Sequence, residues 1–304
     1  MFRFAAVTQK PLIIPIFVPN MGCPNLCTFC NQKIVTGVSE PSLDDVERTV
    51  EEYLSFSKKR KRTEISFYGG SFTAIPKETM MAYISKGAEF VDKKTVNALR
   101  CSTRPDAVDE KTVKILKENH FETVELGVQT MSESLLVKMK RGHSAEDVLK
   151  GVGIIKNNGI TAGLQFMTGY PDESVEDVEI TIDSLKNLKP DFIRIYPFVP
   201  LEGSEMFSEI SSGRKELIQK EEVMERTVSL FLEAMKLKIP VIRIGLPVSS
   251  SMPDIYPHNL SQVVVGRAIE RLAAEGETLF DLPSEWMTSF FTARKKFPQI
   301  LVDK

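Results

Sequence analysis

The chain contains little cysteine, histidine or tryptophan, and it has no long apolar run. It has four cysteines, three histidines and one tryptophan in 304 residues. Four cysteines are too few for a disulfide framework. No apolar run reaches the length of a membrane-spanning helix. The apolar stretch 11–19 is interrupted by Pro15, and no signal-peptide cleavage pattern follows it. We therefore expect a cytoplasmic protein with no membrane segment.

An excess of charge of one sign is also missing. Charged residues make up 26% of the chain, and the formal net charge is −2. This balance argues against a protein that coats nucleic acid or membrane through bulk charge. A local exception is the basic run at residues 58–62. It is either a grip for phosphate groups or a solvated helix end, where cations are favoured, and we favour the second interpretation.

Three of the four cysteines nevertheless lie within eight positions, at Cys23, Cys27 and Cys30. Three thiolates on one short loop can hold three irons of a cubane cluster and leave the fourth iron open to a ligand. Zinc is an alternative, although a structural zinc site normally takes four ligands. Unrelated buried cysteines are a third interpretation. We favour the iron–sulfur cluster, and we expect the fourth cysteine, Cys101, to be a buried core thiol.

Segments rich in β-branched and aromatic residues alternate with segments of helical period. Six strands and a candidate seventh are expected at residues 12–18, 64–68, 98–103, 123–128, 160–167, 192–196 and 241–246. Three of the intervening helices begin at a serine followed three residues later by an aspartate, a variant of the capping box. These pairs are Ser42/Asp45, Ser144/Asp147 and Ser174/Asp177.

This alternation predicts an α/β fold with parallel strands and right-handed crossovers. Fewer than eight units favour a partial, open (β/α)6-type TIM barrel, and a doubly wound open sheet is the alternative. From about Pro247 the pattern changes to a loop at 247–257 and helical segments at 260–275 and 283–296. We therefore expect a barrel over residues 1–246 and a C-terminal helical extension over residues 247–304.

In either fold the chemistry should gather at the carboxyl ends of the strands. The second expected strand ends in Gly69 and Gly70, which let backbone groups approach a ligand closely. The fourth ends at Gln129, an amide that needs hydrogen-bond partners if it is buried. Two further residues have plainer alternatives: Arg141 as a surface cation and Tyr196 as a core residue.

The cysteine spacing, the aromatic Phe29 before the last cysteine, and the position after the first strand resemble the radical S-adenosylmethionine (SAM) superfamily. The ordered strand-end motifs between about residues 14 and 246 are similar to the radical SAM domain of the elongator catalytic subunit. They resemble, more loosely, the oxygen-independent coproporphyrinogen oxidases. The resemblance implies a [4Fe-4S] cluster held by the three cysteines. It also implies reductive cleavage of SAM to a 5′-deoxyadenosyl radical that abstracts a hydrogen atom.

The same resemblance implies roles for individual residues, although it assigns no catalytic side chain. Gly69 and Gly70 would support the amino group of SAM, with Ser71 standing where the family usually has an acidic residue. Gln129 would bind the ribose hydroxyls, and Arg141 would pair with the carboxylate. The remaining expected pocket residues are Ser102 and Arg104, with residues 167–169 and 196–198, including Tyr196, against the adenine.

The elongator resemblance favours a tRNA base as substrate and an electron donor such as flavodoxin or ferredoxin as partner. The sequence shows no acetyltransferase domain after the barrel, so acetyl-CoA chemistry is not expected. Two alternatives stay open. The same radical chemistry can act on a small molecule, or the cluster can serve a non-catalytic accessory protein.

Overall fold

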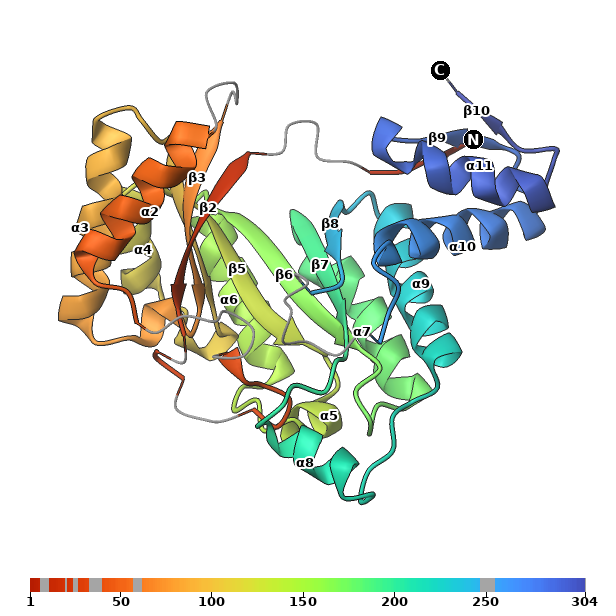
Figure 1. Ribbon diagram of the computed structural model, residues 1–304, viewed down its shortest axis with the longest axis horizontal. Coiled ribbons are helices and arrows are strands. Elements are labelled where there is room, and N and C mark those ends of the chain that lie inside the picture. The colour runs from red at the N-terminus through yellow and green to blue at the C-terminus, as the bar shows by residue number, and fades with distance from the viewer. Residues whose placement is uncertain are drawn as a thin grey trace.

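The computed structural model describes residues 1–5, 11–19, 21–23, 27–32, 40–56, 62–246 and 255–303. Its main element is a sheet of seven parallel strands that curls into a half-barrel with helices on the outside (Figure 1). The strands are β2 (Leu12–Val18), β3 (Thr63–Gly69), β4 (Ala98–Thr103), β5 (Phe121–Gln129), β6 (Thr161–Thr168), β7 (Phe192–Pro197) and β8 (Val241–Ile244).

The strands are neighbours in the order in which they occur in the chain, from β2 to β8. A doubly wound sheet would instead reverse its strand order at a switch point. The sequential order therefore confirms the open, partial barrel, and the candidate seventh strand is present.

The helices that cover the sheet alternate with the strands. They are α2 (Leu43–Phe56), α3 (Lys77–Asp92), α4 (Glu110–Glu118), α5 (Glu133–Lys138), α6 (Ala145–Asn157), α7 (Val175–Leu188), α8 (Glu205–Ser211) and α9 (Lys220–Lys236). Short 3-10 helices follow β3 and β4, namely η1 (Phe72–Ala74) and η2 (Pro105–Ala107). All three expected serine–aspartate caps form, with reciprocal hydrogen bonds at the starts of α2, α6 and α7.

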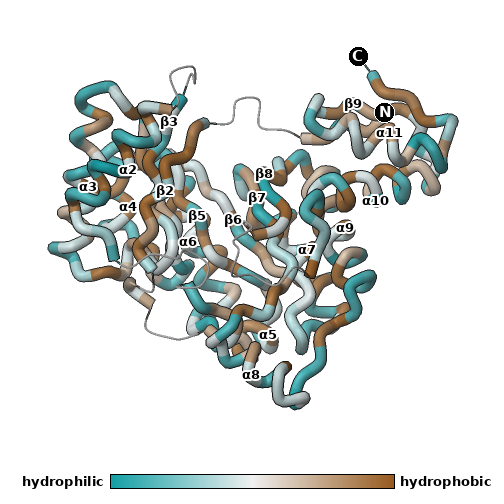
Figure 2. Tube along the Cα trace, in the orientation of Figure 1, coloured by the Kyte–Doolittle hydropathy of each residue, from teal (hydrophilic) through white to brown (hydrophobic). Residues whose placement is uncertain are grey.

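The two faces of the half-barrel differ in polarity. On the outward face, Ile65, Phe67 and Leu126 are fully buried under the helices, and the ring of Phe67 stacks on Phe72 with centroids 4.6 Å apart. Strand β2 is hydrophobic along most of its length (Figure 2). Successive side chains of a strand point to opposite faces. On β3, β4, β5 and β7, the residues that alternate with these outward-facing ones are largely polar or charged, and they point inward. The inner face of the sheet is therefore polar.

A buried ionic network lies on this inner face of the sheet. Glu64 lies 3.2 Å from Arg100, Arg100 lies 3.7 Å from Glu125, and Glu125 accepts from Arg194 and from the hydroxyl of Tyr68. Burial raises the pKa of Glu125, but the two guanidinium groups outweigh it and leave the pKa below its ordinary value. Such networks specify geometry more than they add stability, since desolvation offsets much of the attraction.

A smaller unit is built from the two ends of the described chain. Strands β1 (Phe2–Arg3), β9 (Leu279–Asp281) and β10 (Leu301–Val302) form a parallel sheet with β9 in the centre. Helices α10 (Leu260–Ala274) and α11 (Met287–Lys296), the latter preceded by η3 (Ser284–Trp286), pack beside it. The ring of Phe4 contacts Phe231, Phe280 and Trp286.

Both expected C-terminal helical segments are present, whereas the three-stranded sheet was not expected from the sequence. The division of the chain at residue 246 stays a prediction, and most of the expected loop at 247–257 lies outside the described residues. In the part of the chain that the structure describes, no helix is both long and apolar enough to cross a membrane.

Candidate functional site

The cysteine loop follows β2 at the carboxyl edge of the sheet, near α5 and α8 (Figure 1). It packs directly on the turn after β3. The amide of Ser71 donates to the carbonyl of Met21 across 2.7 Å. A Cβ on Gly70 would lie 2.0 Å from the Met21 oxygen, and one on Gly22 would lie 2.3 Å from the Ser71 oxygen. The contact between the two loops therefore requires glycine at both positions.

The three thiols of this loop are all partly buried. The Sγ of Cys23 lies 3.4 Å from the hydroxyl of Ser71, and the Sγ of Cys27 accepts from Arg141 Nη1 across 3.1 Å. Burial, together with the charges of Cys27 and Cys23, raises the pKa of Cys30 to about 12. A cationic metal core relieves this repulsion, because thiol ligands bind metals as thiolates.

No three His, Cys, Asp or Glu side chains among the described residues are arranged to hold one metal ion together. The three cysteine ligands of a cubane cluster bind three different irons, so they need not converge on one point.

Arg141 links the cysteine loop to the end of β5. Its Nη1 contacts Cys27, its Nη2 donates to the carbonyl of Gly127, and its guanidinium lies 5.9 Å from the centre of the Phe29 ring. The side chain is buried, yet its Nε has no hydrogen-bond partner among the residues that the structure describes. A buried donor of this kind is normally satisfied, so Arg141 has a donor to offer to a ligand.

Gln129 ends β5 with a positive φ of 74°, at a register shift in the pairing of β5 with β6. Its buried side-chain amide pairs reciprocally with that of Gln165, across 3.1 Å and 2.7 Å. A Cβ on Gly127 would lie 3.4 Å from both Arg141 and Gln129. The two predicted residues therefore converge over Gly127, and Gln165 joins them as a residue that the sequence did not single out.

Two more buried side chains lie near Arg141 and the cysteine loop. Arg104 is held by Asp106 through Nε across 2.9 Å, and its Nη1 has no partner among the described residues. His143 likewise has no partner in the described part of the chain at either ring nitrogen. Burial, together with the nearby charge of Arg141, lowers the pKa of His143 to about 4. Within the described residues, Arg104, Arg141 and His143 together hold four of the eight buried side-chain polar atoms that lack a partner.

The remaining predicted residues lie on the inner face of the sheet. Ser102 on β4 is opposite Glu125 in register, and Tyr196 on β7 is opposite Met167. Both are half-buried. Cys101 is fully buried in the core, as expected. Of the basic run at 58–62, only Arg62 lies within the described residues, where it pairs with Glu64 and Glu122.

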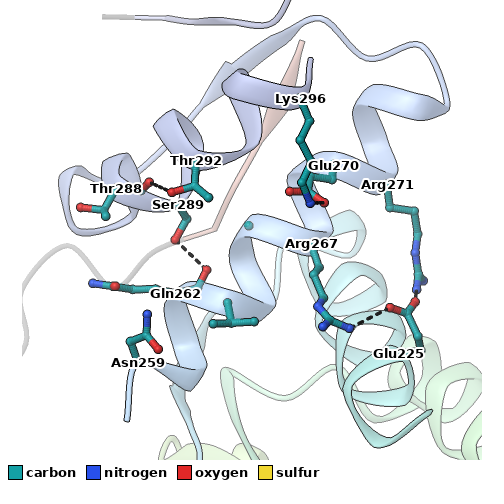
Figure 3. A pocket seen from close by; sticks show the side chains of 12 residues that line it. Glu225, Asn259, Gln262, Arg267, Glu270, Arg271, Thr288, Ser289, Thr292 and Lys296 are labelled. Atoms are coloured by element: carbon teal, nitrogen blue, oxygen red, sulfur yellow. Dashed lines mark hydrogen bonds and ion pairs between the residues drawn. The ribbon is translucent and has the colours of Figure 1, made fainter. Parts of the chain in front are cut away.

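A polar cleft of about 570 Å³ lies outside the half-barrel, between α9, α10 and α11 (Figure 3). Its cations pair with carboxylates of the same cleft: Arg271 with Glu225, and Lys296 with Glu270. It contains none of the thiols or unpartnered buried groups described above. We assign no role to this cleft.

Residues 17–185 match the family model of the Radical SAM superfamily. A tRNA uridine(34) acetyltransferase of Methanocaldococcus jannaschii is 30% identical over 172 residues, which is 55% of this chain and 32% of that protein. The chain therefore spans about a third of the length of that relative.

Two solved structures have the same fold. An N-terminally deleted Elp3 of Methanocaldococcus infernus superposes with a TM-score of 0.68 at 20% identity, covering 87% of this chain and 64% of that one. The coproporphyrinogen III oxidase HemN of Escherichia coli superposes with a TM-score of 0.55 at 14% identity, covering 77% and 54%.

Proposed function

The chain belongs to the Radical SAM superfamily, and from this premise we propose that it binds a [4Fe-4S] cluster and cleaves SAM reductively. Cys23, Cys27 and Cys30 would hold the cluster. When bound, the cluster and SAM supply a 5′-deoxyadenosyl radical that abstracts a hydrogen atom from a substrate. Membership of the superfamily supports an enzyme of this class and leaves open whether it is an oxidoreductase or a transferase.

The observation that carries the proposal is the position of the three partly buried thiols on one loop beside Arg141, which contacts Cys27 directly. The residues present fit both the [4Fe-4S] cluster and SAM. Thiolates are the usual protein ligands of a cubane cluster. The unpartnered Nε of Arg141 and Nη1 of Arg104 offer charge-assisted hydrogen bonds to a carboxylate such as that of SAM.

The other predicted residues would complete the SAM site. Gly69, Gly70 and Ser71 would receive the amino group, largely through backbone carbonyls. Gln129 would exchange its bonds with Gln165 for bonds to the ribose hydroxyls. Three residues would line the pocket further along the inner face: Ser102, Arg104 and Tyr196.

The cluster is tested by anaerobic reconstitution followed by iron analysis. The wild-type protein should hold about four irons per chain. Replacing all three loop cysteines with alanine should abolish the cluster, whereas Cys101→Ser should retain it. A triple variant that still binds a stoichiometric cluster would overturn the assignment. SAM cleavage is measured separately as reductant-dependent formation of 5′-deoxyadenosine, and its absence would favour a non-catalytic accessory protein.

We further propose that the substrate is a base in tRNA and that the electron donor is a flavodoxin or ferredoxin in the cytoplasm. The support is the name of the M. jannaschii relative, a tRNA uridine(34) acetyltransferase. Neutralising residues 58–62 tests whether they contact RNA. If they do, tRNA affinity and its dependence on salt should both fall. No tRNA binding at low salt in the presence of SAM would instead favour a small-molecule substrate.

A further inference from the structure

A second hydrophobic cluster lies against the cysteine loop, separate from the core between sheet and helices. It joins α5, α8 and the ends of β6 and β7 to Phe29 of the loop. Its buried members are Leu135, Met139, Tyr170, Phe198 and Met206. The ring of Tyr170 is fully buried and meets Phe198 edge-on, with centroids 5.7 Å apart.

Thr28 is the point at which the cysteine loop is fixed to this cluster. It is 3% exposed. Its amide donates to the carbonyl of Met139 across 3.1 Å, and its carbonyl accepts from the amide of Met206 across 2.8 Å. Its hydroxyl lies 2.8 Å from the hydroxyl of Tyr170. One residue therefore bonds to the end of α5, the start of α8 and the turn after β6.

The position of Thr28 in the loop gives these bonds a direct effect on the thiols. The amide of Cys30 donates to the carbonyl of Cys27 across 3.0 Å, which closes a turn with Thr28 and Phe29 at its centre. Fixing Thr28 thus fixes the separation and orientation of Cys27 and Cys30. Neither Thr28 nor Tyr170 carries a thiol, the usual protein ligand of a cubane cluster.

We propose that Thr28 and Tyr170 are positioning residues, which hold Cys27 and Cys30 ready for the cluster before any metal arrives. The inference rests on the proposed function for the identity of the metal group, whereas the hydrogen bond between the two hydroxyls involves none of the proposed ligands. Ordering the loop in advance removes an entropic cost from binding. The pair should therefore slow local opening of the loop and, with it, loss of iron.

The test uses variants that remove one hydroxyl and keep the shape of the side chain, Thr28→Val and Tyr170→Phe. A matched control is Thr227→Val, because Thr227 and Thr168 form another buried hydroxyl pair at 2.8 Å, between α9 and β6. Thr28→Ser keeps the hydroxyl and should behave nearly as the wild type. Thermal unfolding of each variant checks that the whole protein is folded.

The first measurement is hydrogen exchange in metal-free protein. The amides of Thr28 and Cys30 should exchange about tenfold faster in Thr28→Val and Tyr170→Phe, as expected for one lost buried hydrogen bond. Combining the two substitutions should have less than the sum of the two single effects, since either one already breaks the pair. The double variant also loses the contacts of the Thr28 hydroxyl with the Met139 carbonyl and of the Tyr170 hydroxyl with the Lys138 carbonyl. The control should leave these two amides unchanged.

The second measurement is the rate at which a chelator removes iron from reconstituted protein, followed by loss of cluster absorbance. Both variants should release iron about tenfold faster than the wild type. Wild-type rates in both measurements would overturn the role of Thr28 and Tyr170 and leave the cluster assignment intact. If the wild type binds no iron, the proposed function fails, and the exchange measurement still decides whether the pair orders the loop.

Discussion

The side-chain nitrogen of Gln165 lies 2.7 Å from the side-chain oxygen of Gln129, and Gln129 returns a hydrogen bond to Gln165 across 3.1 Å. The two amides, on neighbouring strands, satisfy each other at the carboxyl end of the sheet. A ribose hydroxyl can both donate and accept, so it can replace either bond without leaving a buried amide unpartnered.

This pairing predicts unequal effects of the two glutamines on SAM affinity. Gln129→Ala removes the proposed contact and takes both Gln129 bonds from the Gln165 amide, whose nitrogen keeps only the carbonyl of Phe166, so SAM should bind about tenfold more weakly. Gln165→Ala should weaken binding less, by about two- to fivefold, because it only removes support from Gln129. Anaerobic equilibrium dialysis measures both. A larger effect at Gln165 than at Gln129 would reverse the two roles.

Arg141 should affect SAM binding more than cluster assembly. Arg141→Ala removes a charge-assisted donor, which costs about 1.5–3 kcal/mol, or one to two decades in SAM affinity. The iron content should stay near that of the wild type, because the thiols remain. Arg214→Ala is a matched control, since Arg214 is exposed and pairs only with Glu209 in the described structure. Unchanged SAM affinity in Arg141→Ala would remove Arg141 from the pocket.

His143 should make the stability of the metal-free protein depend on pH. Its pKa is lowered from the ordinary 6.5 to about 4 by burial and by the charge of Arg141. Between these values the unfolded chain binds more protons than the folded one. Stability should therefore fall as the pH is lowered from 7 to 4, by up to about 3 kcal/mol from this group.

Urea unfolding of the wild type and His143→Gln at pH 7 and pH 4.5 measures this contribution. The loss of stability on acidification should be smaller in the variant. His120→Gln serves as the control, because His120 is exposed and contacts Asp92. An identical pH response in His143→Gln and the wild type would show that His143 titrates normally.

Two glycines should respond in opposite directions to alanine. A Cβ on Gly163 would lie 2.2 Å from the Phe192 ring, so Gly163→Ala must displace that ring and should destabilise the protein by about 1–3 kcal/mol. A Cβ on Gly153 meets no atom within 4 Å, and Gly153 lies within α6. Gly153→Ala should therefore stabilise by about 0.5–1 kcal/mol. Denaturant midpoints compare the two, and equal signs would contradict the packing described.

The strands and helix starts could be predicted because their signals are local. Runs of β-branched residues mark the strands to within a few positions, and each serine–aspartate pair caps its own helix. The three cysteines could be proposed as cluster ligands from their spacing, and that assignment stays a prediction. The contacts of Gln165 and Thr28 could not be predicted, because they arise from strand register and from partners as distant as Tyr170, which is 142 residues from Thr28. Strands as short as β1 and β10, with two residues each, show no period to detect.

The sequential strand order also bears on how the chain assembles as a ribosome makes it. Each strand from β2 to β8 finds its partner in the segment made just before it, so the half-barrel can grow from one side without waiting for distant sequence. Strand β1 cannot follow this course. Arg3 pairs with Asp281, 278 residues later. Residues 2 and 3 must therefore stay without their sheet partner until β9 has emerged.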